Sequence, residues 1–176
     1  MKNGSYIMAI TLLLFAMQSS IYDVQFQKLN GGNVSMSQFS NKKIIVIAFN
    51  AANPNGARLH YLDSLQIADT SLQVIGVPAT DFSGQGNNGS LNSLSNSLSP
   101  KFVMSKQALV KKESGVNQQS LFKWLTQVNE NGHFDTDAIS ADQLFIISKT
   151  GSLYSVLENG APNNILIQIL NQSVNQ

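Results

Sequence analysis

The sequence contains no cysteine, and this absence excludes a class of chemistry before any motif is considered. Without a thiol, the chain has no disulfide, no cysteine-ligated metal and no reactive thiolate. Charge is also scarce, because only 12% of the residues are Asp, Glu, Lys or Arg, and 11 basic against 10 acidic side chains leave a net charge of +1. A nucleic-acid partner is therefore not expected. A chain of 176 residues is still long enough for one domain with its own core.

An apolar run at the N-terminus has the layout of a secretory signal peptide. Lys2 precedes an apolar stretch over 7–17, and small polar residues follow it. The stretch is short for a membrane span. We expect residues 1–20 to be a signal peptide that is cleaved near Ser19, so that the protein is exported to a periplasmic or extracellular location. An uncleaved membrane anchor and a buried N-terminal helix are the alternatives. One domain would then occupy residues 21–176.

The rest of the chain alternates between strand and helix patterns. Alternating apolar and polar residues around an Asn-Gly-Gly turn at 30–32 predict a β-hairpin. Two continuous apolar runs, at 42–49 and 72–78, are typical of strands that are covered on both faces. The stretch between them, 56–68, has a helical stripe of apolar residues. Together these segments predict a parallel strand-helix-strand unit with a right-handed crossover.

The second half of the chain predicts three helices and another hairpin. Regularly spaced leucines indicate a short helix between Ser90, as its N-cap, and Pro100. A longer helix is expected over 118–132, a hairpin over 143–157, and a last helix after Pro162. This order is that of an α/β thioredoxin-like sandwich, with a mixed central sheet, flanking helices and an N-terminal β-hairpin.

Four segments resemble the glutathione peroxidase family, and they follow one another in that family's order and spacing. Residues 20–52 look like its entry hairpin and first core strand, and "LQVIGVPATDFSGQ" looks like its "GFPCNQFGGQ". Further on, "LFKWL" resembles its "LYKWL", and "LFIISKTGSLYSVLENGAP" resembles its closing hairpin and the Ala-Pro before the last helix. The resemblance covers nearly all of residues 21–176. It implies the thioredoxin-like fold and, by family, peroxide reduction in the response to oxidative stress.

The resemblance also assigns positions to the family's reactive residues. In that family a cysteine or selenocysteine stands in a turn of the type "NVASKCG", supported by a Gln, a Trp and an Asn. The turn corresponds to residues 50–56 here, so that Asn55 occupies the nucleophile position and Gln85 the position of the Gln. The Trp and the Asn correspond to Ser140 and Ala141, within one residue of alignment. Only Gln85 keeps the family's residue type.

An amide at the nucleophile position cannot attack a peroxide, because it neither ionises nor becomes a sulfenic acid. One interpretation of Asn55 is structural: it fits the turn and caps the helix that follows. A second keeps the turn as a ligand site, in which Asn53, Thr80, Asp81 and Gln85 line a pocket at a helix N-terminus.

Two hypotheses about function follow. The first is a non-enzymatic binding or interaction module whose partner is an unidentified small molecule or protein. The second is an enzyme that uses non-thiol chemistry. The absence of cysteine favours the first. We expect no cofactor, and no stable membrane insertion if the signal peptide is cleaved.

The loop His133 to Asp142 is the remaining candidate for a site. Asp135, Asp137 and Asp142 could bind a hard cation. A solvated acidic loop is the simpler interpretation, and we predict no metal site. A Ser-His-Asp triad built on Ser140 is not favoured, because the sequence around it is not a nucleophile elbow.

Overall fold

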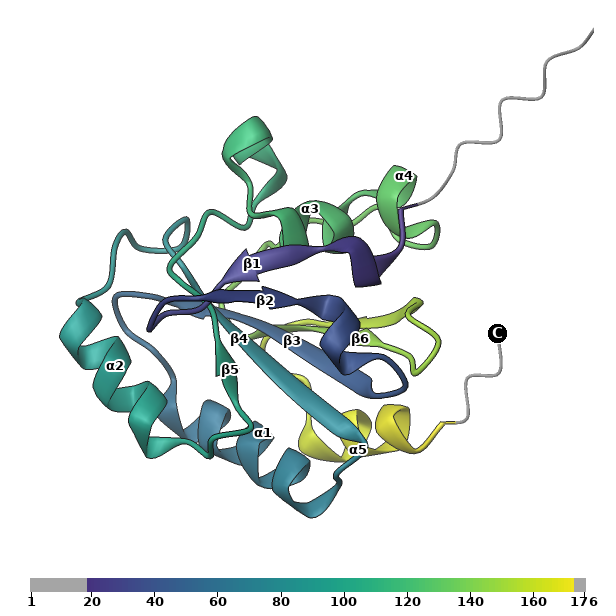
Figure 1. Ribbon diagram of the computed structural model, residues 1–176, viewed down its shortest axis with the longest axis horizontal. Coiled ribbons are helices and arrows are strands. Elements are labelled where there is room, and N and C mark those ends of the chain that lie inside the picture. The colour runs from purple at the N-terminus through teal and green to yellow at the C-terminus, as the bar shows by residue number, and fades with distance from the viewer. Residues whose placement is uncertain (1–18, 173–176) are drawn as a thin grey trace, which may run out of the picture.

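The computed structural model describes residues 19–172, and a mixed five-stranded sheet lies at its centre (Figure 1). The strand order is β5-β4-β3-β6-β7. The two central strands, β3 (Lys43–Asn50) and β4 (Leu72–Ala79), run parallel, and β6 (Gln143–Ile147) pairs with β3 in the antiparallel direction. The edges are β7 (Leu153–Leu157) and the two-residue β5 (Val103–Met104). The sheet is therefore mixed, as the sequence predicts.

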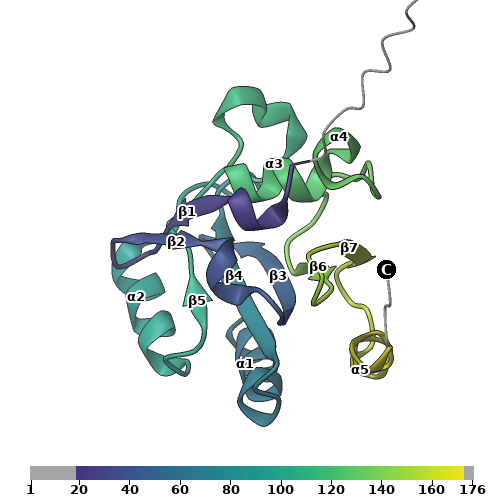
Figure 2. The same ribbon diagram turned by 45° about the vertical axis from the view of Figure 1, so that its right-hand side comes forward.

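Two apolar layers cover the sheet, because side chains alternate between its faces. On β3, Ile45 and Ile47 pack with α1 (Gly56–Ala68), α2 (Asn88–Ser97) and α5 (Asn163–Asn171). Ile44 and Val46 pack on the other face with α3 (Ser120–Thr126) and with the hairpin of β1 (Gln25–Gln27) and β2 (Asn33–Ser35). The turned view shows α1 and α5 on the side of the sheet opposite α3 (Figure 2).

Most of the predicted elements are confirmed. The N-terminal hairpin turns at the Asn-Gly-Gly sequence, and β3, α1 and β4 form the expected parallel unit. The hairpin β6-β7 and the helix after Pro162 are also present. Trp124 is 3% exposed and belongs to the core, as its helical spacing predicts.

Two helix predictions need correction. The helix α2 begins earlier than expected, because the N-cap is Asn87, whose Oδ1 accepts a hydrogen bond from the N–H of Ser90 at 3.0 Å. The single helix expected over 118–132 is divided into α3 and α4 (Val128–Asn131) by an extended residue, Gln127. The side chain of Asn131 donates to the carbonyls of Trp124 and Leu125, so polar side-chain contacts replace the next helical turn.

The predicted signal peptide lies outside the described residues, apart from Ser19 and Ser20. Within residues 19–172, every helix is too short or too polar to cross a bilayer.

Candidate functional site

The turn at the carboxyl end of β3 is built around the side chain of Asn50. Its Oδ1 accepts hydrogen bonds from the N–H groups of Ala52 and Asn53, at 2.9 and 3.0 Å, and from the hydroxyl of Ser83. This arrangement is an Asx turn, in which a short polar side chain replaces a backbone partner. It reverses the chain and directs it into α1.

Asn55 ends this turn and caps α1 with its own side chain. Its Oδ1 accepts from the N–H of Arg58 at 3.1 Å, which satisfies one of the free donors at the helix N-terminus. Its Nδ2 donates to Oδ2 of Asp142 at 2.9 Å. Both polar atoms of the amide are therefore used in contacts within the fold.

Asp142 enters this site from the start of β6 in an uncommon conformation. Its φ of 66° is left-handed, which short polar residues such as Asp tolerate better than most. Its N–H donates to the carbonyl of Ala48 at 2.6 Å, which anchors it to β3. Asp142 is 9% exposed, and its Oδ1 is buried without a hydrogen-bond partner among the residues described. The contact with Ala48 thus holds the carboxylate of Asp142 beside Asn55.

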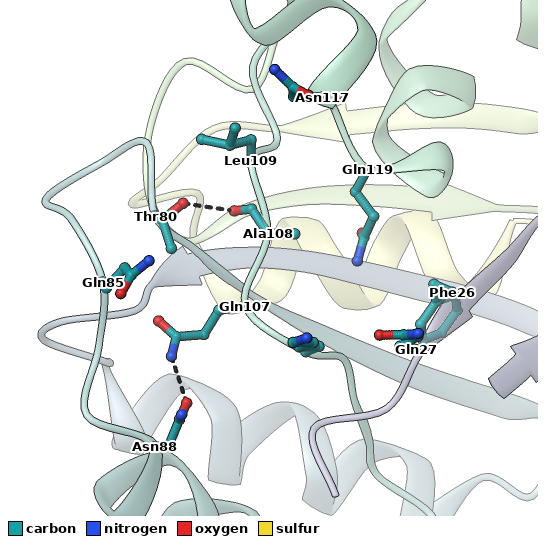
Figure 3. Close-up of a pocket in the computed structure, with 11 residues that line it drawn as sticks. Phe26, Gln27, Thr80, Gln85, Asn88, Gln107, Ala108, Leu109, Asn117 and Gln119 are labelled. Carbon is teal, nitrogen blue, oxygen red and sulfur yellow. Dashed lines mark hydrogen bonds between the residues drawn. The ribbon is translucent and has the colours of Figure 1, made fainter. Parts of the chain in front are cut away.

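The other predicted positions do not gather around Asn55. Ser140 and Ala141 precede β6, and it is the following residue, Asp142, that contacts Asn55. This one-position difference lies within the alignment tolerance of the resemblance. The side chain of Gln85 makes no hydrogen bond within residues 19–172 and lines a separate hollow, together with Thr80 (Figure 3).

Neither Asn53 nor Asp81 lines that hollow. The carboxylate of Asp81 instead accepts from the N–H groups of Val110 and Lys111, both at 2.8 Å, and holds the segment after residue 109. The side chain of Asn53 is exposed. Of the four residues predicted to line a pocket at the helix N-terminus, Thr80 and Gln85 line this separate hollow instead.

The loop that carries Gln85 is docked on the turn through Gly86. A Cβ at Gly86 would lie 1.9 Å from the carbonyl oxygen of Ala51, so only glycine allows this approach. The side chain of Gln107 holds the same residue from the other side, because its Oε1 accepts from the N–H of Gly86 at 2.7 Å and its Nε2 donates to the carbonyl at 3.0 Å. The sequence did not single out Gln107, which lies far from the turn along the chain.

The acidic loop uses its carboxylates for structure. Asp135 lies 2.5 Å from Nζ of Lys112, and this hydrogen bond lowers the pKa of the exposed carboxyl. Asp137 accepts from the N–H of Lys112 at 2.9 Å, and Asp142 faces Asn55. Within the part of the chain that the structure describes, no three His, Asp or Glu side chains are grouped to hold a metal ion.

Fold and site together define a class: a thioredoxin-like α/β protein in which the turn after β3 ends at an asparagine and the sequence has no thiol. No protein-family model matches the chain. Over 142 residues it is 28% identical to glutathione peroxidase 1 of Caenorhabditis elegans, a match that covers 77% of this chain and 84% of that protein.

Solved structures agree with this class. The structure of T. cruzi GPX1 matches with a TM-score of 0.64 at 18% identity, covering 86% of this chain and 95% of that one. A thioredoxin-like protein from Aeropyrum pernix matches with a TM-score of 0.58 at 12% identity, covering 86% and 90%. The sequence match supports the resemblance to the glutathione peroxidases, and the solved structures show that the fold is thioredoxin-like.

Proposed function

We propose that this protein is an exported, non-catalytic relative of the glutathione peroxidases that acts as a binding or interaction module. The observation that carries the proposal is the side chain of Asn55. At the position where the family has its nucleophile, this amide caps α1 and donates to Asp142 at 2.9 Å. A residue whose amide oxygen and nitrogen are both occupied in this way stabilises the start of α1 and its contact with the residue before β6.

Peroxide reduction requires a group that attacks oxygen and is then regenerated. A thiolate or selenolate can do this, whereas an amide cannot ionise or pass through a sulfenic acid. The sequence contains no thiol at any position. Methionine sulfur is oxidised to the sulfoxide and needs a separate reductase to be restored, so it supplies no turnover here. These facts favour a retained fold with a different task.

Export is proposed from the N-terminal sequence alone. A lysine, an apolar stretch over 7–17 and small polar residues follow one another in the order of a signal peptide. A protein without cysteine is also indifferent to the redox state of its compartment.

The proposal is tested by measuring peroxide consumption with hydrogen peroxide and an organic hydroperoxide, in metal-free buffer, with glutathione or thioredoxin as reductant. We expect the rate with protein to equal the rate without it. Turnover above that background would contradict the proposal. The variant Asn55→Ala locates any such activity, because a reaction that depends on this turn would be lost in the variant and an unrelated one would remain.

A further inference from the structure

The hollow that Gln85 lines is a second candidate site, separate from Asn55. It has a volume of about 570 Å³ and lies among the end of β1, the loop after β4, and the segments around residues 107 and 118 (Figure 3). This size is in the range of pockets that bind small ligands. Its lining has one charged group, Lys106, and no carboxylate. Six of its residues carry side-chain amides: Gln27, Gln85, Asn88, Gln107, Asn117 and Gln119.

One wall of the hollow is a stretch of chain at the sheet edge whose outer side is only partly paired. Beyond β5 the chain continues along β4, and its outer side is covered at both ends. The N–H of Lys106 donates to the carbonyl of Gln27 at 2.8 Å, and the N–H of Gln119 donates to the carbonyl of Leu109 at 2.9 Å. Between these two contacts, the main-chain N–H and C=O of Gln107 make no hydrogen bond with any residue in 19–172. An unpaired main-chain N–H and C=O on one residue offer a donor and an acceptor with which an extended segment can pair.

The side chain of Gln119, which also lines the hollow, has an oxygen atom that accepts no hydrogen bond within residues 19–172. Its Nε2 donates to the hydroxyl of Ser105 at 3.4 Å, and that hydroxyl gives its own proton to the carbonyl of Lys106 at 2.8 Å. Because Ser105 can only accept from Gln119, the amide orientation is set. The Oε1 of Gln119 is then buried without a partner among the residues described. A ligand N–H can reach this oxygen only if the Gln119 side chain rotates towards the hollow, and the contact would then remove the cost of an unpaired buried acceptor.

Gln107 shows how an amide side chain in this hollow recognises main chain. It pairs with Gly86 through both of its polar atoms, taking the N–H and donating to the C=O. The Nζ of Lys106 makes no ion pair or hydrogen bond within residues 19–172 and is left for an acidic group. We propose that the hollow binds an extended peptide segment of a partner protein, with its main chain paired at Gln107 and Gln119 and a carboxylate beside Lys106. This inference rests on the proposed binding role and names its partner class.

The probe is a random octapeptide library displayed on phage and selected on the immobilised protein. We expect enriched peptides to carry Asp, Glu or a free carboxyl terminus. Titration of the best peptide into ¹⁵N-labelled protein should then shift the amide resonances of Gln107 and Gln119. The inference would be overturned if no peptide enriched, or if the shifts were confined to another surface.

Two variants test the contacts, each with a matched control outside the hollow. Gln119→Leu should weaken the selected peptide about tenfold, and Lys106→Met should weaken it about fivefold or more. If Gln119→Leu fails to fold, Lys106→Met decides alone. Replacing the peptide's carboxylate with an amide should cost as much as Lys106→Met, and the two changes together should cost no more than either one. The controls Gln38→Leu and Lys149→Met, both at exposed residues, should leave the affinity unchanged. Equal losses in variants and controls would contradict the assignment.

The peptide experiment and the peroxide assay test the two proposals independently. If no peptide binds and no peroxide is consumed, the peptide site is wrong and the non-catalytic proposal stands. If peroxide is consumed through Asn55, the proposed function falls whatever the hollow binds.

Discussion

Asn55 joins two parts of the fold that lie 87 residues apart in the sequence. Its oxygen satisfies a donor of α1, a contact worth about 1 kcal/mol in typical N-caps. Its nitrogen donates to the carboxylate of Asp142, and hydrogen bonds to charged groups contribute about 1.5 to 3 kcal/mol. Asp142 is nearly buried, so the loss of this donor leaves a carboxylate with less compensation for its burial.

The first prediction concerns this double contact. Asn55→Ala should lower the free energy of unfolding by about 2 kcal/mol, because it removes the cap and the donor to Asp142 together. Urea denaturation measures the change. Asn53→Ala is the matched control, since the exposed side chain of Asn53 in the same turn makes no hydrogen bond within residues 19–172, and it should change stability by less than about 0.5 kcal/mol. If the two variants have equal stability, Asn55 has no structural role.

At the scale of elements, the loop after β4 packs against the turn after β3. The loop after β4 lies against the turn through Gly86 and through the hydroxyl of Ser83, which donates to Asn50. Gln107 ties this loop to the chain that runs beside β4. The turn, the loop and the amide-lined hollow therefore depend on one close backbone contact.

The second prediction tests that contact. Gly86→Ala should lower the free energy of unfolding by about 2 kcal/mol or more, because its methyl group would lie 1.9 Å from the oxygen of Ala51. Gly56→Ala is the comparison: at the start of α1 its Cβ would meet only Leu94, at 3.8 Å, and alanine should stabilise the helix by up to about 1 kcal/mol. The opposite signs can be read from thermal unfolding. A neutral Gly86→Ala would show that the loop is not docked as described.

The elements that could be predicted from the sequence are those with a strong local pattern. The β-branched runs of β3 and β4 and the stripe of α1 carry their structure in their own residues. The break at Gln127 could not be predicted, since it depends on Asn131 reaching back to the carbonyls of α3. Strand β5 is only two residues long and exists because β4 offers it a partner.

The position of the turn could be predicted from the sequence, but its tertiary contacts could not. The turn could be aligned by its flanking strand and helix, which placed Asn55 at its end. The pairing with Asp142 depends on a left-handed backbone that no sequence pattern at this position requires. The hollow draws its amides from several separate segments, so that only the folded chain reveals them as neighbours.

At the scale of the whole molecule, the described chain enters the core at its third residue, Ile21. Ile21 is 1% exposed, Ser20 caps the short helix that contains it, and the indole N–H of Trp124 donates to the carbonyl of Ser19 at 2.8 Å. Removal of residues past Ser20 would therefore delete a buried apolar side chain.

The third prediction is that the natural host releases a mature protein that begins near Ser19. Cleavage there follows the small polar residues of the signal-like segment and preserves Ile21 in the core. Intact-mass measurement of the exported protein decides the position. A full-length N-terminus on protein in the soluble fraction would contradict cleavage.

We infer that the turn after β3 keeps the family's geometry, with an amide-carboxylate pair in place of the thiol. If so, Asn55→Cys places a thiol where the N–H groups at the start of α1 favour the thiolate. Asp142 opposes this, because a neighbouring carboxylate disfavours a second negative charge. Asp142→Asn removes the opposition and suits the left-handed backbone at that position.

The most direct measurement is the rate at which hydrogen peroxide oxidises this single thiol, followed by mass spectrometry. The double variant Asn55→Cys, Asp142→Asn should react about tenfold faster than Asn55→Cys alone, the factor that follows from a difference of about one pKa unit between the thiols when both are mostly protonated. It should also react faster than free cysteine. A double variant that oxidises no faster than free cysteine would show that the turn does not have the family's geometry, which would contradict the inference that it is a former nucleophile site.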